Sequence, residues 1–75
     1  NCMEEKVLAI INLIREHKGM ESLNEISINC LLRDDLGFTS FDLAELTVRI
    51  EDEFDIDIFE DGIVSTVGDI LNKLK

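Results

Sequence analysis

The sequence predicts an all-α fold of three main helices, with a short or distorted third helix before the last one and a long first loop. Apolar residues recur every three or four positions in the ranges 7–14, 43–54 and 67–74, which places them on one helix face. The second and last of these segments also begin with the pattern of a helix capping box. Strand-like alternation is confined to residues 55–58, and four residues without a partner strand cannot form a sheet.

The first helix is expected to run from Glu4 to about Lys18. Glu4 and Glu5 stand where acidic side chains interact favourably with a helix N-terminus, and Gly19 is a natural stop. We interpret His17, in the last turn, as a surface residue because the sequence offers it no catalytic partner. The apolar face consists of Val7, Ile10, Ile11 and Ile14.

The segment 20–36 contains aliphatic residues without a sustained period. It therefore predicts a long ordered loop that is held in place by these side chains. A loop of this length is uncommon in so small a domain and is often functional. Its aliphatic residues are Leu23, Ile26, Ile28, Leu31 and Leu32.

The second helix is expected from Ser40 to about Glu53. Thr39 and Asp42 form the capping box, which leaves the Ser40 hydroxyl exposed on the first turn. The predicted buried stripe consists of Leu43, Leu46, Ile50 and Phe54. The residues predicted to lie outside are Asp42, Glu45, Val48, Arg49 and Asp52.

The remaining segments are shorter. Residues 55–58 are expected to form an extended connector, and Phe59 to Val64 a third helix of one turn or a distorted one. The terminal helix begins at the capping box of Thr66 and Asp69. Its apolar face consists of Val67, Ile70, Leu71 and Leu74.

Length and charge limit the class of protein. A chain of 75 residues makes one domain, which we place at residues 3–75, and we expect Asn1 and Cys2 to be a remnant of cloning. Residues 34–61 hold eleven acids and one base, so this region alone has a net charge of −10, which equals the formal net charge of the whole chain. Such a surface repels nucleic acid and anionic lipid and attracts basic protein surfaces. We expect a cytoplasmic monomer that does not insert into membranes.

Catalysis and metal binding are not predicted. The single histidine and the two cysteines lack partner motifs, and no G-x-S-x-G pattern surrounds Ser40. The calcium-loop windows that start at Asp34 and Asp57 lack ligands at required positions. Cys30 is interpreted as a small core residue. We therefore expect neither an enzyme nor a metal site.

The most specific pattern surrounds Ser40. It reads Asp35-Leu36-Gly37-x-x-Ser40-x-Asp42, then Glu45-Leu46, then an acidic and aliphatic stretch from Ile50 to Ile58. In this pattern, and over nearly its whole length, the chain resembles the acyl carrier proteins. The resemblance implies an acyl-carrier-like helical bundle with 4′-phosphopantetheine attached covalently to Ser40. The thiol that carries cargo then belongs to the cofactor.

The resemblance also implies the partners. They are a phosphopantetheinyl transferase, which attaches the arm from coenzyme A, and acyl-transferring or acyl-loading enzymes with basic docking surfaces. In the resembling family the helix that follows the serine is the recognition element. By this resemblance the partner-binding residues are Asp42, Glu45, Val48, Glu51 and Asp52.

Three functions stay open at the level of the sequence. The chain is an acyl carrier in the biosynthesis of fatty acids or of related lipids and secondary metabolites, a dedicated acyl or aminoacyl carrier loaded by an adenylate-forming ligase, or an unmodified acidic adaptor. The family usually has Asp before the serine and Leu after it, where this chain has Thr39 and Phe41. This difference and the short third helix favour the dedicated carrier.

Overall fold

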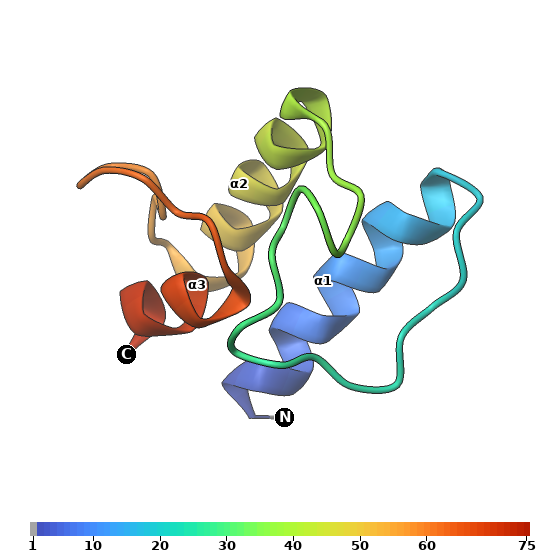
Figure 1. Ribbon diagram of the computed structural model, residues 1–75. Helices are drawn as coiled ribbons and strands as arrows, with labels where there is room; N and C mark the ends of the chain where they lie inside the picture. Colours follow the sequence, from blue (N-terminus) through green and yellow to red (C-terminus); the bar gives the residue numbers. More distant parts are fainter. Residues whose placement is uncertain (1) are drawn as a thin grey trace.

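The computed structural model describes residues 2–75 and contains three α-helices joined by irregular segments (Figure 1). The helices are α1 (Met3–His17), α2 (Ser40–Phe54) and α3 (Val67–Leu74). Across the described residues the only pairing of β type is an isolated antiparallel bridge between Leu31 and Thr66. The predicted all-α fold with three main helices is therefore confirmed.

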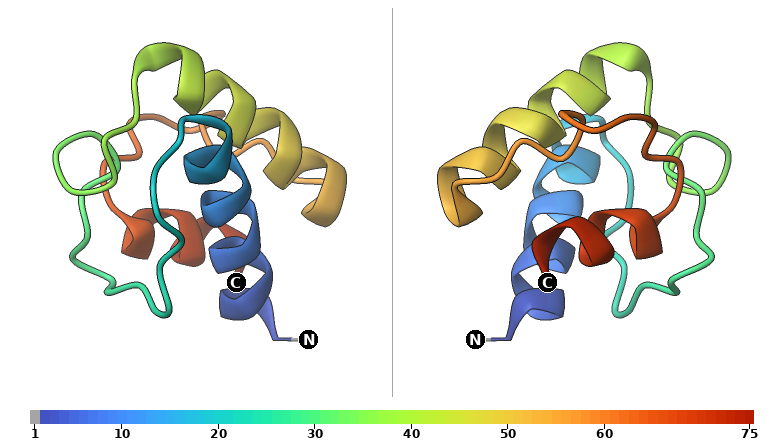
Figure 2. Two further views of the ribbon diagram at one scale, coloured as in Figure 1. Left: turned by 90° about the vertical axis from the view of Figure 1, so that its right-hand side faces the viewer. Right: turned by 90° about the vertical axis from the view of Figure 1, so that its left-hand side faces the viewer.

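Helix α1 lies at the centre of the molecule and packs against both α2 and α3 (Figure 2). Its residues Val7, Ile11 and Ile14 are fully buried, and α2 contributes Leu46 and Ile50 to the same core. Burial of apolar surface between these faces is the main stabilising contribution in a domain of this size. The other buried apolar residues are Leu32, Leu36, Phe38, Ile58, Val64, Val67, Ile70 and Leu71.

The long loop between α1 and α2 is ordered by polar side chains of α1. The Asn12 amide donates to the Leu23 carbonyl oxygen at 2.8 Å and accepts from the Leu23 N–H at 2.7 Å. The Arg15 guanidinium, which is largely buried, donates to the carbonyl oxygens of Glu21 and Leu36 at 3.0 and 2.9 Å. The loop therefore returns alongside α1 before it turns toward α2 (Figure 1).

The same loop meets α3 at a glycine. The Gly68 N–H donates to the Ile28 carbonyl oxygen at 2.9 Å, and a Cβ atom on Gly68 would lie only 2.8 Å from that oxygen. A larger residue would therefore push the loop away from the helix. Nearby, Thr66 and Asp69 form the predicted capping box, with both backbone N–H bonds at 3.0 Å.

The segment Phe59 to Val64, expected to be a helix of one turn or a distorted one, contains turns at 58–61 and no regular helix. The Glu60 N–H donates to the Asp57 carbonyl oxygen at 3.2 Å, and the Gly62 N–H donates to the Phe59 carbonyl oxygen at 3.5 Å. Too few residues lie between the buried Ile58 and Val64 to repay the cost of starting a helix. Ile63, between these two anchors, is 90% exposed.

Candidate functional site

Ser40 is the first residue of α2, and its side chain is exposed. The chain enters the helix through Gly37, which has a φ of +75°, and through Phe38, which is buried. The Phe38 N–H donates to the Leu32 carbonyl oxygen at 3.0 Å. A left-handed glycine followed by a buried aromatic residue fixes the direction of the chain just before the serine. Ser40 therefore lies exposed at the start of α2, as predicted.

The predicted capping box is formed at the start of α2. The Thr39 N–H donates to Asp42 Oδ2 at 2.8 Å, and the Asp42 N–H donates to Thr39 Oγ1 at 3.2 Å. Over residues 2–75, the backbone N–H groups of Ser40 and Phe41 have no protein acceptor. These groups and the helix dipole give the surface beside the serine a partial positive charge.

Asp42 was expected on the outer face of α2, and this placement is wrong. The residue is only 5% exposed, and its Oδ2 lies 2.7 Å from Lys18 Nζ at the end of α1. Burial alone would raise the pKa of Asp42. The hydrogen bonds from Lys18 and Thr39 together outweigh this effect, so the pKa of Asp42 lies below its ordinary value. The first turn of α2 packs against the end of α1, and Asp42 therefore faces that helix.

Glu45 is partly enclosed by bases. Its Oε2 lies 2.8 Å from Arg49 Nε, one turn further along α2, and 3.5 Å from His17 Nδ1. His17 is a surface residue, as predicted, and it has an acidic partner that the sequence did not indicate. Glu51 and Asp52 are exposed and make no ion pair with any residue of the described chain. The unpaired negative charge of α2 is therefore concentrated in its second half.

The outer face of α2, defined here as Phe41, Glu45, Val48 and Asp52, carries large exposed apolar groups. Phe41 is 78% exposed and Val48 is 57% exposed. Together with Ala44, Glu45 and Arg49 they line a surface pocket of about 360 Å³. Since this pocket starts one residue after Ser40, the serine stands at the end of an apolar strip with charged edges.

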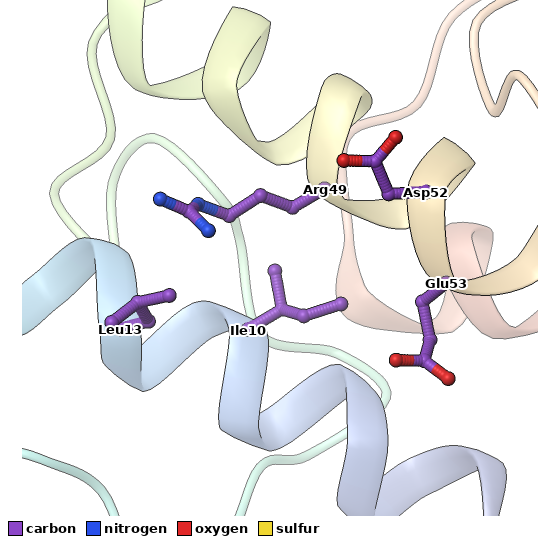
Figure 3. A pocket seen from close by; sticks show the side chains of 5 residues that line it. All are labelled: Ile10, Leu13, Arg49, Asp52 and Glu53. Carbon is purple, nitrogen blue, oxygen red and sulfur yellow. The ribbon is translucent and has the colours of Figure 1, made fainter.

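A second pocket lies between α1 and α2. Figure 3 shows Ile10 and Leu13 of α1 opposite Arg49 and Glu53 of α2, with the carboxylate of Asp52 directed away from α1. The pocket has a volume of about 230 Å³, and its apolar floor belongs to α1 while its charged rim belongs to α2. Arg49 lines both pockets, so the charged edge of the outer face of α2 continues toward α1.

Arg33 is a residue of the site that reasoning from the sequence missed. Its Nη2 donates to Ser40 Oγ at 2.9 Å across seven positions of sequence. Because the serine oxygen is the acceptor, its own proton is left free for another partner. No periodicity or motif links these two positions, and only the three-dimensional path of the loop brings them together.

Cys30 is not a candidate site. It is half-buried against the core, close to the expected interior position. Burial, and secondarily the charge of Asp35, raises the pKa of its thiol despite an opposing effect of Arg15. A thiol with a raised pKa is a poor nucleophile near neutral pH. Within the described residues, no group of three or more His, Cys, Asp or Glu side chains could hold a metal ion.

The residues around Ser40 fit a phosphodiester. The exposed hydroxyl can be esterified without a change in the core, and the free N–H groups at the start of α2 favour an anion. The guanidinium of Arg33 already contacts the oxygen that would carry the phosphorus. Serine, helix end and arginine together form a surface that is compatible with a covalently attached phosphate group.

Comparison with known proteins agrees with this interpretation. The family model described as "Phosphopantetheine attachment site" matches residues 9–74. The acyl carrier protein of Clostridium acetobutylicum is 36% identical over 66 residues, which cover 85% of this chain and 84% of the relative. No solved structure matches the chain significantly. The chain belongs to the acyl carrier protein family.

Family membership settles the general class of chemistry. The protein is a carrier and not an enzyme, and its cofactor is phosphopantetheine. Acyl carrier proteins work with a phosphopantetheinyl transferase and with enzymes that handle acyl groups. None of the helices in residues 2–75 is long and apolar enough to cross a membrane.

Proposed function

We propose that this protein holds acyl groups as thioesters on a phosphopantetheine arm attached to Ser40, and that it presents them to partner enzymes. The observation that carries the proposal is the exposed hydroxyl of Ser40 at the capped start of α2, inside the range matched by the family. The other serines are Ser22, Ser27 and Ser65, and none of them begins a helix.

The proposed attachment takes coenzyme A as the donor. Ser40 Oγ would lose its proton and form a bond to the phosphorus nearest the pantetheine, while the pyrophosphate bond from this phosphorus to oxygen breaks and adenosine 3′,5′-bisphosphate leaves. The N–H groups at the start of α2 stabilise the resulting phosphodiester anion. When bound, the group supplies the thiol that carries cargo. The rigid start of α2 fixes the point at which the flexible arm begins.

Attachment can be tested directly. The purified apo protein would be incubated with coenzyme A, magnesium and a broad-specificity phosphopantetheinyl transferase, and its intact mass measured. The wild type and the control Ser65→Ala should each gain one arm, and Ser40→Ala should gain none. An arm on Ser40→Ala, or its absence from the wild type, would refute the assignment of Ser40.

The partner surface is proposed to be the outer face of α2 together with Glu51. Val48 supplies an exposed apolar anchor, and Glu51 and Asp52 supply unpaired negative charge. Glu45 contributes at the edge of the pocket, partly neutralised by Arg49. Enzymes with a basic rim around an apolar contact are the complementary partners. Asp42 is left out of this surface because it is buried.

Two pathways are proposed for this carrier. A role in the synthesis of fatty acids or of related lipids and secondary metabolites agrees with the similarity to the clostridial acyl carrier protein. The exposed Phe41 beside Ser40 and the turns at 58–61 favour a dedicated carrier loaded by an adenylate-forming ligase. Offering the holo protein either a malonyl-transferring enzyme or such ligases with ATP distinguishes these pathways. If the protein is instead an unmodified adaptor, no arm is attached to it.

A further inference from the structure

We propose that Arg33 binds the phosphodiester of the arm. The inference rests on the proposed attachment at Ser40. It concerns a residue outside α2 that contacts the serine oxygen directly, at 2.9 Å.

The backbone position of Arg33 is fixed by a tight turn. Its neighbours Leu32 and Leu36 are buried, each with 1% exposure. The Leu36 N–H donates to the Leu31 carbonyl oxygen, and the Gly37 N–H donates to the Arg33 carbonyl oxygen, both at 3.0 Å. The side chain is flexible, but the turn anchors its base close to the start of α2. A contact that begins at a fixed point loses less conformational entropy on binding.

The charge of Arg33 is available to a ligand. Although Asp34 and Asp35 follow it directly, Arg33 makes no ion pair with any of residues 2–75. Asp35 instead accepts from the Leu31 N–H at 2.8 Å. The other base near the start of α2, Lys18, is already paired with Asp42. Within residues 2–75, Arg33 is therefore a cation beside Ser40 that has no ionic partner and can meet a phosphate there.

Esterification changes the acceptor that Arg33 contacts. In the apo protein the acceptor is a neutral hydroxyl oxygen. After attachment, this oxygen is bonded to phosphorus, and the two nonbridging oxygens that carry the negative charge are one bond further away. Guanidinium groups bind such oxygens through charge-assisted hydrogen bonds that are roughly twice as strong as neutral ones. The existing contact thus places Arg33 next to the charge that attachment creates.

Four proteins test the inference: the wild type, Arg33→Gln, Arg33→Lys and Arg49→Gln. Each would be treated with coenzyme A and the transferase, and the intact mass would establish that the arm is present. The ³¹P NMR resonance of the phosphodiester would then be followed with increasing salt, and thermal melts would be recorded with and without the arm. Arg49→Gln is the matched control because it removes the same charge from a later turn of α2.

The ³¹P resonance of the wild type should be displaced from that of Arg33→Gln. The arm should raise the melting temperature of the wild type by about 2–4 °C more than that of Arg33→Gln. Both differences should narrow at high salt, since the pair is exposed. Arg33→Lys should be intermediate because it keeps the charge without the planar guanidinium. Arg49→Gln loses its pair with Glu45, but its ³¹P resonance and the change in its melting temperature on attachment of the arm should match those of the wild type.

Two results would overturn the inference, and only the second would also overturn the proposed function. If the arm is present and the wild type and Arg33→Gln agree in ³¹P resonance and in the effect of the arm on melting, Arg33 does not bind the phosphodiester. The proposed function would then still stand. If the wild type gains no arm, the proposed function fails and the inference fails with it.

Discussion

Lys18 Nζ lies 2.7 Å from Asp42 Oδ2, and this ion pair joins the end of α1 to the first turn of α2. Asp42 also accepts from the Thr39 N–H and completes the capping box. One carboxylate therefore both starts α2 and ties it to the central helix. Because Ser40 lies between Thr39 and Asp42 in sequence, the same contacts fix the position of the candidate attachment site.

Removal of the Lys18 charge should destabilise the protein. Lys18→Met leaves the nearly buried Asp42 carboxylate without its ionic partner, at an expected cost of about 1–2 kcal/mol in the free energy of unfolding at pH 7. Lys6→Met is the matched control because the pair of Lys6 with Glu53 is exposed and should contribute less than about 1 kcal/mol. Urea unfolding measures both costs. Equal costs would contradict the structural role of Lys18.

The same pair should give a pH dependence. The pKa of Asp42 is lowered in the folded state, so its stabilisation is present above the unfolded pKa of about 3.9. The stabilisation is lost as the pH falls through the folded pKa. The difference in unfolding free energy between the wild type and Lys18→Met should therefore be constant from about pH 7 to pH 5 and should narrow below about pH 4. A difference that grows on acidification would contradict this assignment.

The hydroxyl of Thr39 should stabilise the start of α2. Thr39→Ala removes the acceptor of the Asp42 N–H and should cost about 1 kcal/mol, or a decrease of roughly 4–8 °C in melting temperature. Thr39→Ser keeps the hydroxyl and should melt close to the wild type. Thermal melts by circular dichroism make the comparison. If the alanine and serine variants melt together, the cap does not contribute.

Charge on the second half of α2 should control association with a basic partner. Asp52→Lys should slow association without a large change in stability, because Asp52 is exposed and makes no ion pair in the described chain. Glu45→Lys should slow association as well and, unlike Asp52→Lys, should in addition lower the stability of the protein, since it places a third base beside Arg49 and His17. Glu25→Lys, in the long loop, is the matched control for net charge.

Stopped-flow association rates at several salt concentrations test this prediction. The rates of the wild type and of Glu25→Lys should fall as salt rises, and the rate of Asp52→Lys should be lower and less sensitive to salt. Rates that are the same for Asp52→Lys and Glu25→Lys would show that only the net charge matters.

The segment 59–64 should open more easily than α2. Apart from the packing of the partly buried Phe59 and the buried Val64, turn hydrogen bonds hold this segment, and Ile63 is exposed. Negative charges surround the segment at Asp57, Glu60 and Asp61. In native-state hydrogen exchange its amides should exchange faster than those of residues 43–53. Added salt should narrow the gap by screening the carboxylates. Equal protection of both segments would mean that these turns are as stable as the helix.

Features that depend on neighbouring residues were predictable from the sequence. The capping boxes at Thr39 and Thr66 and the apolar spacing gave the start of α2 and α3 because both signals act within one or two turns. The position of Ser40 at a helix start follows from the same local signal. The proposed chemical role of Ser40 could be predicted only from the resemblance to a known family.

Contacts between separate elements were not predictable in this way. Asp42 precedes Leu46 and Ile50 by four and eight residues, so the helical period of α2 itself places it on the buried face, and the expected outer position was wrong. The period contains no information on where α1 ends, so the pair with Lys18 could not be predicted from it. The contact of Arg33 with Ser40 depends on the path of the loop, which is set by Asn12 and Arg15. Such polar contacts obey no sequence period, because either partner can lie anywhere along the chain.

The central claim is that Ser40 carries phosphopantetheine in the functional protein. The most direct test is the intact mass of the protein purified from the organism that encodes it, followed by fragmentation of the peptide that contains Ser40. We predict a single phosphopantetheine, free or acylated, and fragments that place it on Ser40. A chain of unmodified mass, or an arm on another residue, would contradict the account.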